Sequence, residues 1–199
     1  MKSKLLLSIA ALVLIAQPAV QAAPIHYEGN IIVNGPAVTG LVGPFSWFDE
    51  DAPNTDFWSF FGIAGRVYSI RGTRLNANLD PALALYFGTT TADESQFNPF
   101  GSFGGLQYIA GADDEIEVPG PFGDPFLRLS LPQTGLYTIA LGGAASDCPG
   151  GVCPPNGYPY SLTVQVPEPS TLALLLIAVA GIGWTLRRQG LVGINQSAV

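Results

Sequence analysis

Short segments in which hydrophobic and polar residues alternate recur through the middle of this 199-residue chain. In residues 158–166, for example, Tyr160, Leu162, Val164 and Val166 fall on one face of an extended strand. Gly, Pro, Asn and Asp separate these segments, and no segment of this region repeats with the 3.6-residue period of a helix. Segments of this kind, or short apolar runs, occupy residues 25–33, 56–61, 66–71, 82–87, 126–131, 136–141 and 158–166. The pattern predicts an all-β fold, a single β-sandwich with a jelly-roll-like arrangement.

Two stretches of this region lack a clear pattern. Residues 36–54 and 89–105 are rich in Gly, Phe and acidic residues, and we expect long loops there. Gly62 and Gly65 lie between two predicted strands and suit a tight hairpin. In the second stretch Phe97, Phe100 and Phe103 recur at a spacing of three, either as core residues that cover an edge of the sandwich or as an exposed aromatic platform for sugar rings.

The apolar run at residues 171–186 differs from the rest of the chain, because it contains no charge and is apolar on every face. As a helix, 16 residues cover about 24 Å, somewhat less than the ~30 Å hydrocarbon core of a bilayer. Snorkelling arginines and local bilayer thinning can make up this difference. Arg187 and Arg188 follow the run and place its C-terminal side in the cytoplasm. The run therefore predicts a transmembrane helix rather than a buried core helix, which would show an amphipathic stripe.

A second apolar run lies near the N-terminus. Residues 1–22 contain Lys2 and Lys4, an apolar stretch of 12 residues and a small-residue site that fits cleavage after Ala22 or Ala23. This pattern predicts a signal peptide, handled by the export machinery and signal peptidase. Residues 23–166 then form one exported domain.

The order of features at the C-terminal end resembles the bacterial PEP-CTERM sorting signal. Pro167, Glu168 and Pro169 precede the apolar run, and the arginine pair closes it, so the signal spans residues 167–188 and leaves a short tail at 189–199. The resemblance implies an exported protein of a Gram-negative bacterium that exosortase processes near the Pro-Glu-Pro motif. It further implies a transient anchor in the inner membrane, then display on the cell surface or release, in species that form exopolysaccharide and biofilm.

Residues 51–166 resemble the bacterial pre-peptidase C-terminal domain, a small β-sandwich. The matching stretches include 56–60, 64–68, 109–114, 126–129, 135–139 and 160–164. No protease domain accompanies them, so a role as a peptidase accessory is not carried over.

The charge of the predicted domain is strongly negative. Residues 23–166 contain four arginines and fourteen acidic residues, a net charge of −10. Such a surface excludes nucleic acid as an expected partner. Cations or a hydrated polysaccharide are the partners that this charge favours.

Acidic clusters are the main candidates for a binding site. Asp49 and Asp51 flank Glu50 before one predicted strand, and Asp113 and Asp114 follow another segment. Calcium prefers several carboxylate and carbonyl oxygens, so these four aspartates are candidate calcium ligands, and no other cofactor is expected. Some pre-peptidase-type domains bind calcium, and the resemblance aligns Asp113 and Asp114 with their paired aspartates. The alternative is that these acids are solvated loop charges.

The cysteines and the histidine limit other chemistry. Cys148 and Cys153 enclose Pro-Gly-Gly-Val, and an exported protein favours a disulfide between them over a redox pair or half of a metal site. His26, the sole histidine, lies close to the cleavage site, so no catalytic residue is expected. We expect a non-enzymatic structural or adhesive protein of the envelope or extracellular matrix. A calcium-dependent carbohydrate- or protein-binding module and a small glycoside hydrolase are the alternatives.

Overall fold

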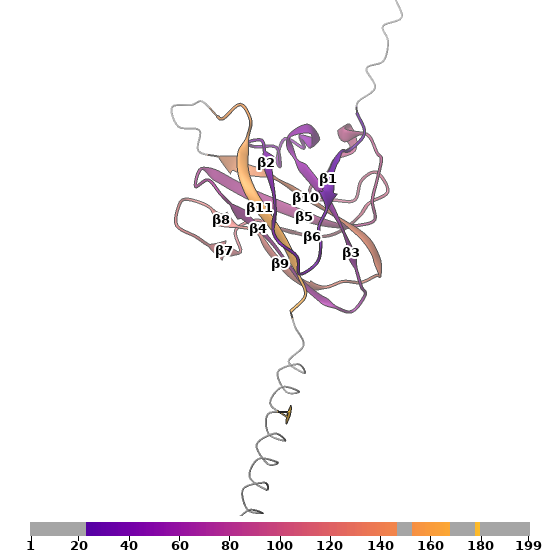
Figure 1. Cartoon of the computed structure of the whole chain (residues 1–199). Coiled ribbons are helices and arrows are strands. Elements are labelled where there is room, and N and C mark those ends of the chain that lie inside the picture. Colours follow the sequence, from indigo (N-terminus) through magenta and orange to yellow (C-terminus); the bar gives the residue numbers. More distant parts are fainter. Residues whose placement is uncertain (1–22, 147–152, 168–177, 180–199) are drawn as a thin grey trace, which may run out of the picture.

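Two β-sheets packed face to face form the domain (Figure 1). The computed structural model describes residues 23–146, 153–167 and 178–179. One sheet has the strand order β1-β3-β10-β5-β6, the other β2-β11-β4-β9, and β7 pairs with β8 in a small ribbon. The strands are β1 (Tyr27–Asn30), β2 (Val38–Val42), β3 (Asp56–Gly62), β4 (Val67–Arg74), β5 (Leu79–Phe87), β6 (Gln107–Ala112), β7 (Ile116–Glu117), β8 (Gly123–Asp124), β9 (Phe126–Ser130), β10 (Gly135–Ser146) and β11 (Tyr158–Gln165). The prediction of an all-β sandwich is confirmed.

The main hydrophobic core lies between the two sheets. The alternation in residues 158–166 is confirmed, because Tyr160, Leu162 and Val164 of β11 are buried and the residues between them are more exposed. These side chains meet Phe60 of β3 and Ile139 of β10 from the facing sheet in one buried cluster. Burial of this many large apolar side chains is the main stabilising contribution to such a sandwich.

A second core covers the outer face of the five-stranded sheet. Strand β5 is buried along nearly its whole length, as expected of a continuous apolar strand with both faces covered. The cover consists of the loops at 43–55 and 88–106, which carry the short helices η1 (Ala52–Asn54) and η2 (Glu94–Gln96). Phe97 and Phe103 are buried in this second core, whereas Phe100 is exposed. The core interpretation of the phenylalanine repeat therefore holds for two of its three members.

Three features differ from the sequence-based predictions. Strand β2 lies inside the predicted loop at 36–54, and β6 lies in a segment rich in small residues; each pairs with one neighbour at a sheet edge. Gly40 of β2 leaves no room for a side chain beside Asp56 and Tyr160, so packing and not β-propensity selects this residue. The predicted hairpin at Gly62 is wrong, because β3 and β4 belong to different sheets. A Cβ at Gly62 would overlap Leu131 and Tyr137, where the chain crosses between the layers.

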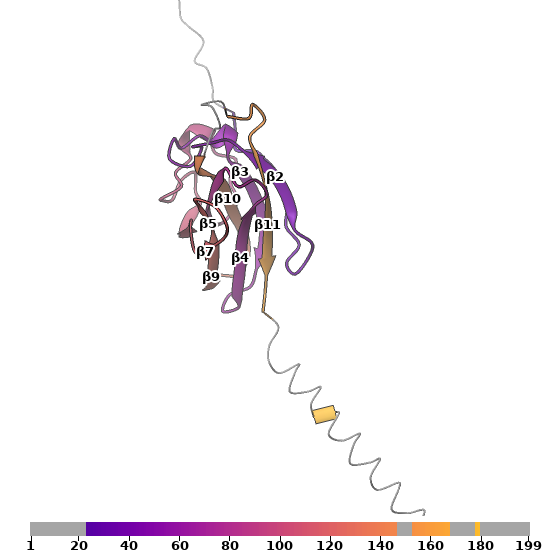
Figure 2. The same ribbon diagram turned by 90° about the vertical axis from the view of Figure 1, so that its left-hand side faces the viewer.

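The two ends of the sandwich are formed by different loops. The turns at 31–37, 63–66 and 131–134 lie where β11 ends and the chain leaves at Val166 and Pro167; we call this the tail end. The loops at 43–55 and 75–78 and the turn at 113–115 lie toward the opposite end, which we call the site end. Figures 1 and 2 show the described chain starting near the site end and leaving at the tail end.

Several predicted segments lie outside the described residues. These are the signal peptide at 1–22, Cys148, Glu168 and Pro169, most of 171–186, Arg187 and Arg188, and the tail at 189–199. Within the described part of the chain, no helix has both the length and the apolar character needed to cross a bilayer.

Candidate functional site

Three aspartates converge at the site end. Asp80 is the second residue of β5, and Asp113 and Asp114 follow β6 directly. Because β5 and β6 are antiparallel neighbours with Leu83 opposite Ala112, the turn after β6 returns to the level at which β5 begins. One carboxylate oxygen from each aspartate lies within 4.8 Å of the other two.

This cluster contains buried oxygens without partners. Asp80 is only 8% exposed, and neither its Oδ1 nor the Oδ1 of Asp113 has a hydrogen-bond partner among the described residues. Burial, the larger cause, and the charges of Asp113 and Asp114 raise the pKa of Asp80 to about 7. Burial and the charges of Asp114 and Glu115 raise the pKa of Asp113 to about 6. Three carboxylates in this arrangement repel one another unless a proton or a cation neutralises them.

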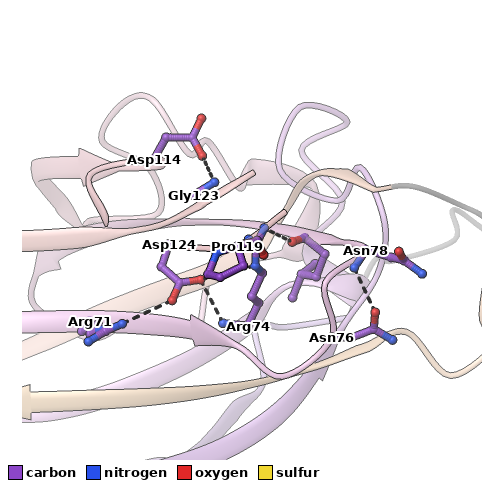
Figure 3. Close-up of polar contacts among 9 residues, drawn as sticks. Arg71, Arg74, Asn76, Asn78, Asp114, Pro119, Gly123 and Asp124 are labelled. Carbon is purple, nitrogen blue, oxygen red and sulfur yellow. Dashed lines mark hydrogen bonds and ion pairs between the residues drawn. The ribbon is translucent and has the colours of Figure 1, made fainter. Parts of the chain in front are cut away.

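The arginines nearby are bound to another acid. Asp124 is fully buried, and Arg74 and Arg71 reach it from β4, with Arg71 Nη2 at 3.5 Å from Asp124 Oδ2 (Figure 3). Arg74 Nε lies 3.9 Å from Asp124 Oδ1, while the same guanidinium donates to the carbonyl oxygens of Leu79 and Pro119. Arg74 opposes the rise in the pKa of Asp80, but it is the smallest of the causes that act on this group. The three clustered aspartates therefore keep most of their mutual repulsion.

The structure separates the four aspartates predicted as calcium ligands. Asp113 and Asp114 meet Asp80, and neither Asp49 nor Asp51 belongs to this group or to any other such group of three within the described ranges. Asp51 instead accepts a hydrogen bond from Asn54 Nδ2 at 2.7 Å, in the turn that leads into η1. Asp80 was missed because an Asp-Pro pair before a strand is a common turn signal. Its place at the start of an apolar strand was the available clue.

An aromatic hollow of about 260 Å³ adjoins the cluster through Asp113. Phe48 and Phe100 are both exposed at its wall, and their rings stack with centroids 5.9 Å apart. Tyr108 and Glu115 also line the hollow, and Trp47 contributes to its wall although its side chain is buried. Trp58 lies in the main core. The exposed aromatic wall of this hollow is thus made by Phe48 and Phe100, whereas Trp47 and Trp58 are buried.

A second pair of acids lines a separate hollow of about 640 Å³. Glu28 and Asp56 both lie at its wall, beside Gly40 of β2. Tyr160 donates from its hydroxyl to Asp56 Oδ2 at 2.6 Å, and Trp58 Nε1 donates to the same hydroxyl at 2.7 Å. Burial, the largest cause, raises the pKa of Asp56 to about 6, and the charge of Glu28 acts in the same direction.

The remaining candidate residues lie away from the aspartate cluster or at the limits of the described chain. His26 is exposed near the start of the described chain. Cys153 is disulfide-bonded, and because Cys148 lies outside the described residues, the pairing of these two cysteines remains a prediction. Pro167 is the last described residue before the sorting motif continues.

Two solved structures similar to this domain come from a surface-associated and a secreted protein. A surface-associated copper-binding protein of Methylomicrobium album BG8, CorA, is 14% identical with a TM-score of 0.54, over 71% of this chain and 98% of that chain. The copper-binding secreted protein MopE of Methylococcus capsulatus is 11% identical with a TM-score of 0.50, over 73% and 92%. At these identities the likeness shows a shared fold alone.

The pre-peptidase C-terminal domain of a Bacillus anthracis collagenase is also similar, at 15% identity over 70% of this chain and 96% of that chain. Its TM-score of 0.39 is too low to support a functional argument. No curated protein matches the chain. The family model of the PEP-CTERM protein-sorting motif matches residues 165–189, which include all three residues of the predicted motif and the arginine pair. The chain therefore carries a PEP-CTERM protein-sorting motif at the end of its β-sandwich domain.

Proposed function

We propose that this protein is a surface protein whose β-sandwich binds a calcium ion through Asp80, Asp113 and Asp114. The sorting motif indicates an exported protein that exosortase handles. The observation that carries the calcium proposal is a pair of buried carboxylate oxygens in two members of the aspartate cluster, for which the described residues provide no hydrogen-bond partner. Buried polar atoms in native proteins nearly always have a partner, and here a cation bound by the cluster supplies it.

The chemistry of the donors favours calcium over copper. CorA and MopE are described as copper-binding, and copper(II) prefers imidazole or other nitrogen ligands. The aspartate cluster offers oxygen atoms alone, and hard cations such as calcium prefer carboxylate and carbonyl oxygens. His26, the sole histidine, is not a member of the cluster.

The proposed role is structural or adhesive and non-enzymatic, at the surface of a Gram-negative cell or in its exopolysaccharide matrix, after a transient stay in the inner membrane. Support comes from the aromatic hollow beside Asp113, since the faces of exposed aromatic rings suit the apolar faces of sugar rings. The same hollow favours calcium-dependent carbohydrate binding as the second candidate function.

A small hydrolase remains the third class, with Glu28 and Asp56 as its candidate acids. In the structure the hydroxyl of Tyr160 is bound to Asp56, which favours a structural role for this carboxyl group. Loss of a measurable glycosidase activity in both Glu28→Gln and Asp56→Asn would support the hydrolase instead.

A calcium titration of thermal stability tests the proposed site. With calcium at about 100 times its dissociation constant, we expect Tm to rise by roughly 5–10 °C above its value in chelator. Asp80→Asn should abolish this rise, and Asp49→Asn, which removes an acid outside the cluster, should preserve it.

Parallel titrations with magnesium and copper(II) set the selectivity. A larger shift with copper than with calcium, retained in Asp80→Asn, would contradict the calcium site. The absence of any shift with calcium would contradict the calcium site and favour protonation as the way in which the cluster is neutralised.

A further inference from the structure

Exposed apolar side chains gather at the tail end. Ile32 is 70% and Phe61 55% exposed, and Ile63 and Val67 are exposed as well. These residues come from the turn after β1, from the end of β3, from the crossing between β3 and β4 and from the start of β4. Exposed hydrophobic residues that cluster in this way mark a contact surface more often than isolated ones do. We call Ile32, Phe61, Ile63, Arg66 and Val67 the tail-end surface.

The tail leaves the domain directly beside this surface. Phe61, Ile63 and Arg66 line the same hollow, of about 360 Å³, as Val166 and Pro167. The backbone N–H of Val166 donates to Asn34 Oδ1 at 2.7 Å, and the backbone N–H of Asn34 donates to the carbonyl oxygen of Val164 at 2.9 Å. These two hydrogen bonds hold the departing chain against the turn that follows β1. The chain is therefore held against the domain as far as Val166.

The distance from this exit to a membrane is limited by covalent geometry. Four peptide links join Pro167 to Thr171, where the apolar run begins, and they span at most about 14 Å. The headgroup layer on each side of the hydrocarbon core is itself about 6 Å thick. If residues 171–186 span the bilayer, as their sequence predicts, the exit point lies within about 8 Å of the headgroups. A span that is short for the bilayer draws its flanking residues still closer.

The charge of the tail end suits this position. The turns at 31–37, 63–66 and 131–134 contain no acidic residue, and their one charged side chain is Arg66. This contrasts with the net charge of −10 over residues 23–166. Anionic headgroups would repel an acidic surface, and they attract an apolar one that carries an arginine.

We propose that the tail-end surface contacts the lipid headgroups for as long as the chain is attached to its membrane segment. The sandwich then stands on the bilayer with Phe61, Ile63 and Arg66 at the interface and the aspartate cluster directed away from it. The proposal does not depend on calcium binding. It gives the surface one occupant, the bilayer that holds the tail, and it places the Pro-Glu-Pro motif at the membrane boundary.

Spin labelling of the chain from Ala23 to Val199 tests this contact. The protein is reconstituted into vesicles of phosphatidylcholine and phosphatidylglycerol, and a nitroxide is attached to Ile63→Cys without reducing agent. Power saturation with oxygen and with a water-soluble nickel chelate then measures the surroundings of the label. Lipid contact should lower the nickel accessibility at position 63 at least fivefold relative to Phe48→Cys at the site end, and raise its oxygen accessibility.

Two reagents separate the possible results. Burial against protein lowers accessibility to both oxygen and nickel, whereas contact with lipid lowers nickel and raises oxygen. Equal accessibilities at positions 63 and 48 would overturn the proposal. So would a label that becomes shielded from both reagents only when exosortase is added, because the occupant would then be a protein. Ala64→Cys, in the same exposed turn, repeats the measurement if Ile63→Cys does not fold.

Discussion

The two ends of this sandwich differ in their charge, although both expose apolar side chains, such as Phe48 at the site end and Phe61 at the tail end. The site end gathers three aspartates beside a hollow with stacked phenylalanines, and two of these aspartates have buried oxygens without a hydrogen-bond partner in the described part of the chain. The tail end has turns without acidic residues, a single arginine and exposed aliphatic side chains. Long strands such as β4, with 8 residues, and β10, with 12, reach from one end of the sandwich to the other. The contrast between the ends therefore arises in the loops. A sandwich of this kind can present one end to a ligand and the other to the membrane.

The largest expected effect concerns the arginine that supports the site end. Arg74→Met should destabilise the protein by about 2–4 kcal/mol, because it removes a buried guanidinium from beside the fully buried Asp124, leaves the half-exposed Arg71 as its ion-pair partner and frees two carbonyl oxygens. Urea unfolding measures this change. The control Arg128→Met removes an exposed arginine of β9 and should change stability by less than about 0.5 kcal/mol. Equal losses in both variants would show that Asp124 does not depend on Arg74.

The pH dependence of stability should come from the acids near the site end. Burial raises the pKa of Asp56 to about 6 from an ordinary value of 3.8, so the folded state favours its protonated form. This contribution to stability is complete below pH 3.8 and is lost as the pH rises through 6. Asp56→Asn keeps an acceptor for Tyr160 and should gain about 1–2 kcal/mol at pH 8, after allowance for partial exposure. Urea unfolding between pH 4 and pH 8 in chelator measures the gain, and a constant difference between variant and wild type across this range would contradict it.

At the tail end, the charge of Arg66 should set the preference for anionic lipid. For the label at position 63, replacing phosphatidylcholine by a mixture with phosphatidylglycerol should deepen the contact. Arg66→Gln should weaken that response by about 1 kcal/mol, or roughly fivefold in the contact equilibrium. Arg128→Gln, on the face of β9, is the matched control. An equal response in wild type and Arg66→Gln would show that Arg66 does not contribute and that the apolar side chains alone make the contact.

The smallest effect concerns the aromatic wall at the site end. Phe100→Ala removes the ring that stacks on Phe48, and because both rings are exposed, stability should fall by about 0.5–1 kcal/mol. The same variant should weaken binding of an acidic or neutral polysaccharide severalfold in affinity electrophoresis. Phe61→Ala, at the tail end, should leave that binding unchanged. Equal retardation of the wild type, Phe100→Ala and Phe61→Ala would contradict sugar binding in the hollow.

Alternation predicts the strands that cross the core and the edge strand β9, but it misses the edge strands β2 and β6. Strand β11 is predictable from Tyr160, Leu162 and Val164, because burial on one face imposes a two-residue period on the sequence. The burial of β2 also alternates, but its sequence does not show this period, since Gly40 is selected by the close approach of Tyr160 and Leu41 is exposed. Edge strands pair with one neighbour only, so fewer of their residues need to be apolar.

The candidate site was predictable only in part. Asp113 and Asp114 stand together in the sequence, and a pair of adjacent acids is a visible signal. Asp80 joins them through the pairing of β5 with β6, a contact between segments about thirty residues apart that no local pattern encodes. Asp49 and Asp51 form a similar acidic cluster in the sequence. In the structure, however, Asp51 lies directly before η1 and binds Asn54. The sorting motif needs no tertiary contact, and for that reason its linear sequence was sufficient.

The course of β11 has a mechanical consequence. This strand runs the length of the sandwich between β2 and β4 and ends just before Val166 and Pro167, where the described chain leaves the domain (Figure 1). If the site end is held by a ligand while the tail is held by the cell, tension acts along β11 and parallel to its neighbours. The hydrogen bonds on both sides of the strand are then loaded in shear and must break together, whereas a load across the strand would open them one after another. The topology thus suits a domain that carries force between its two ends.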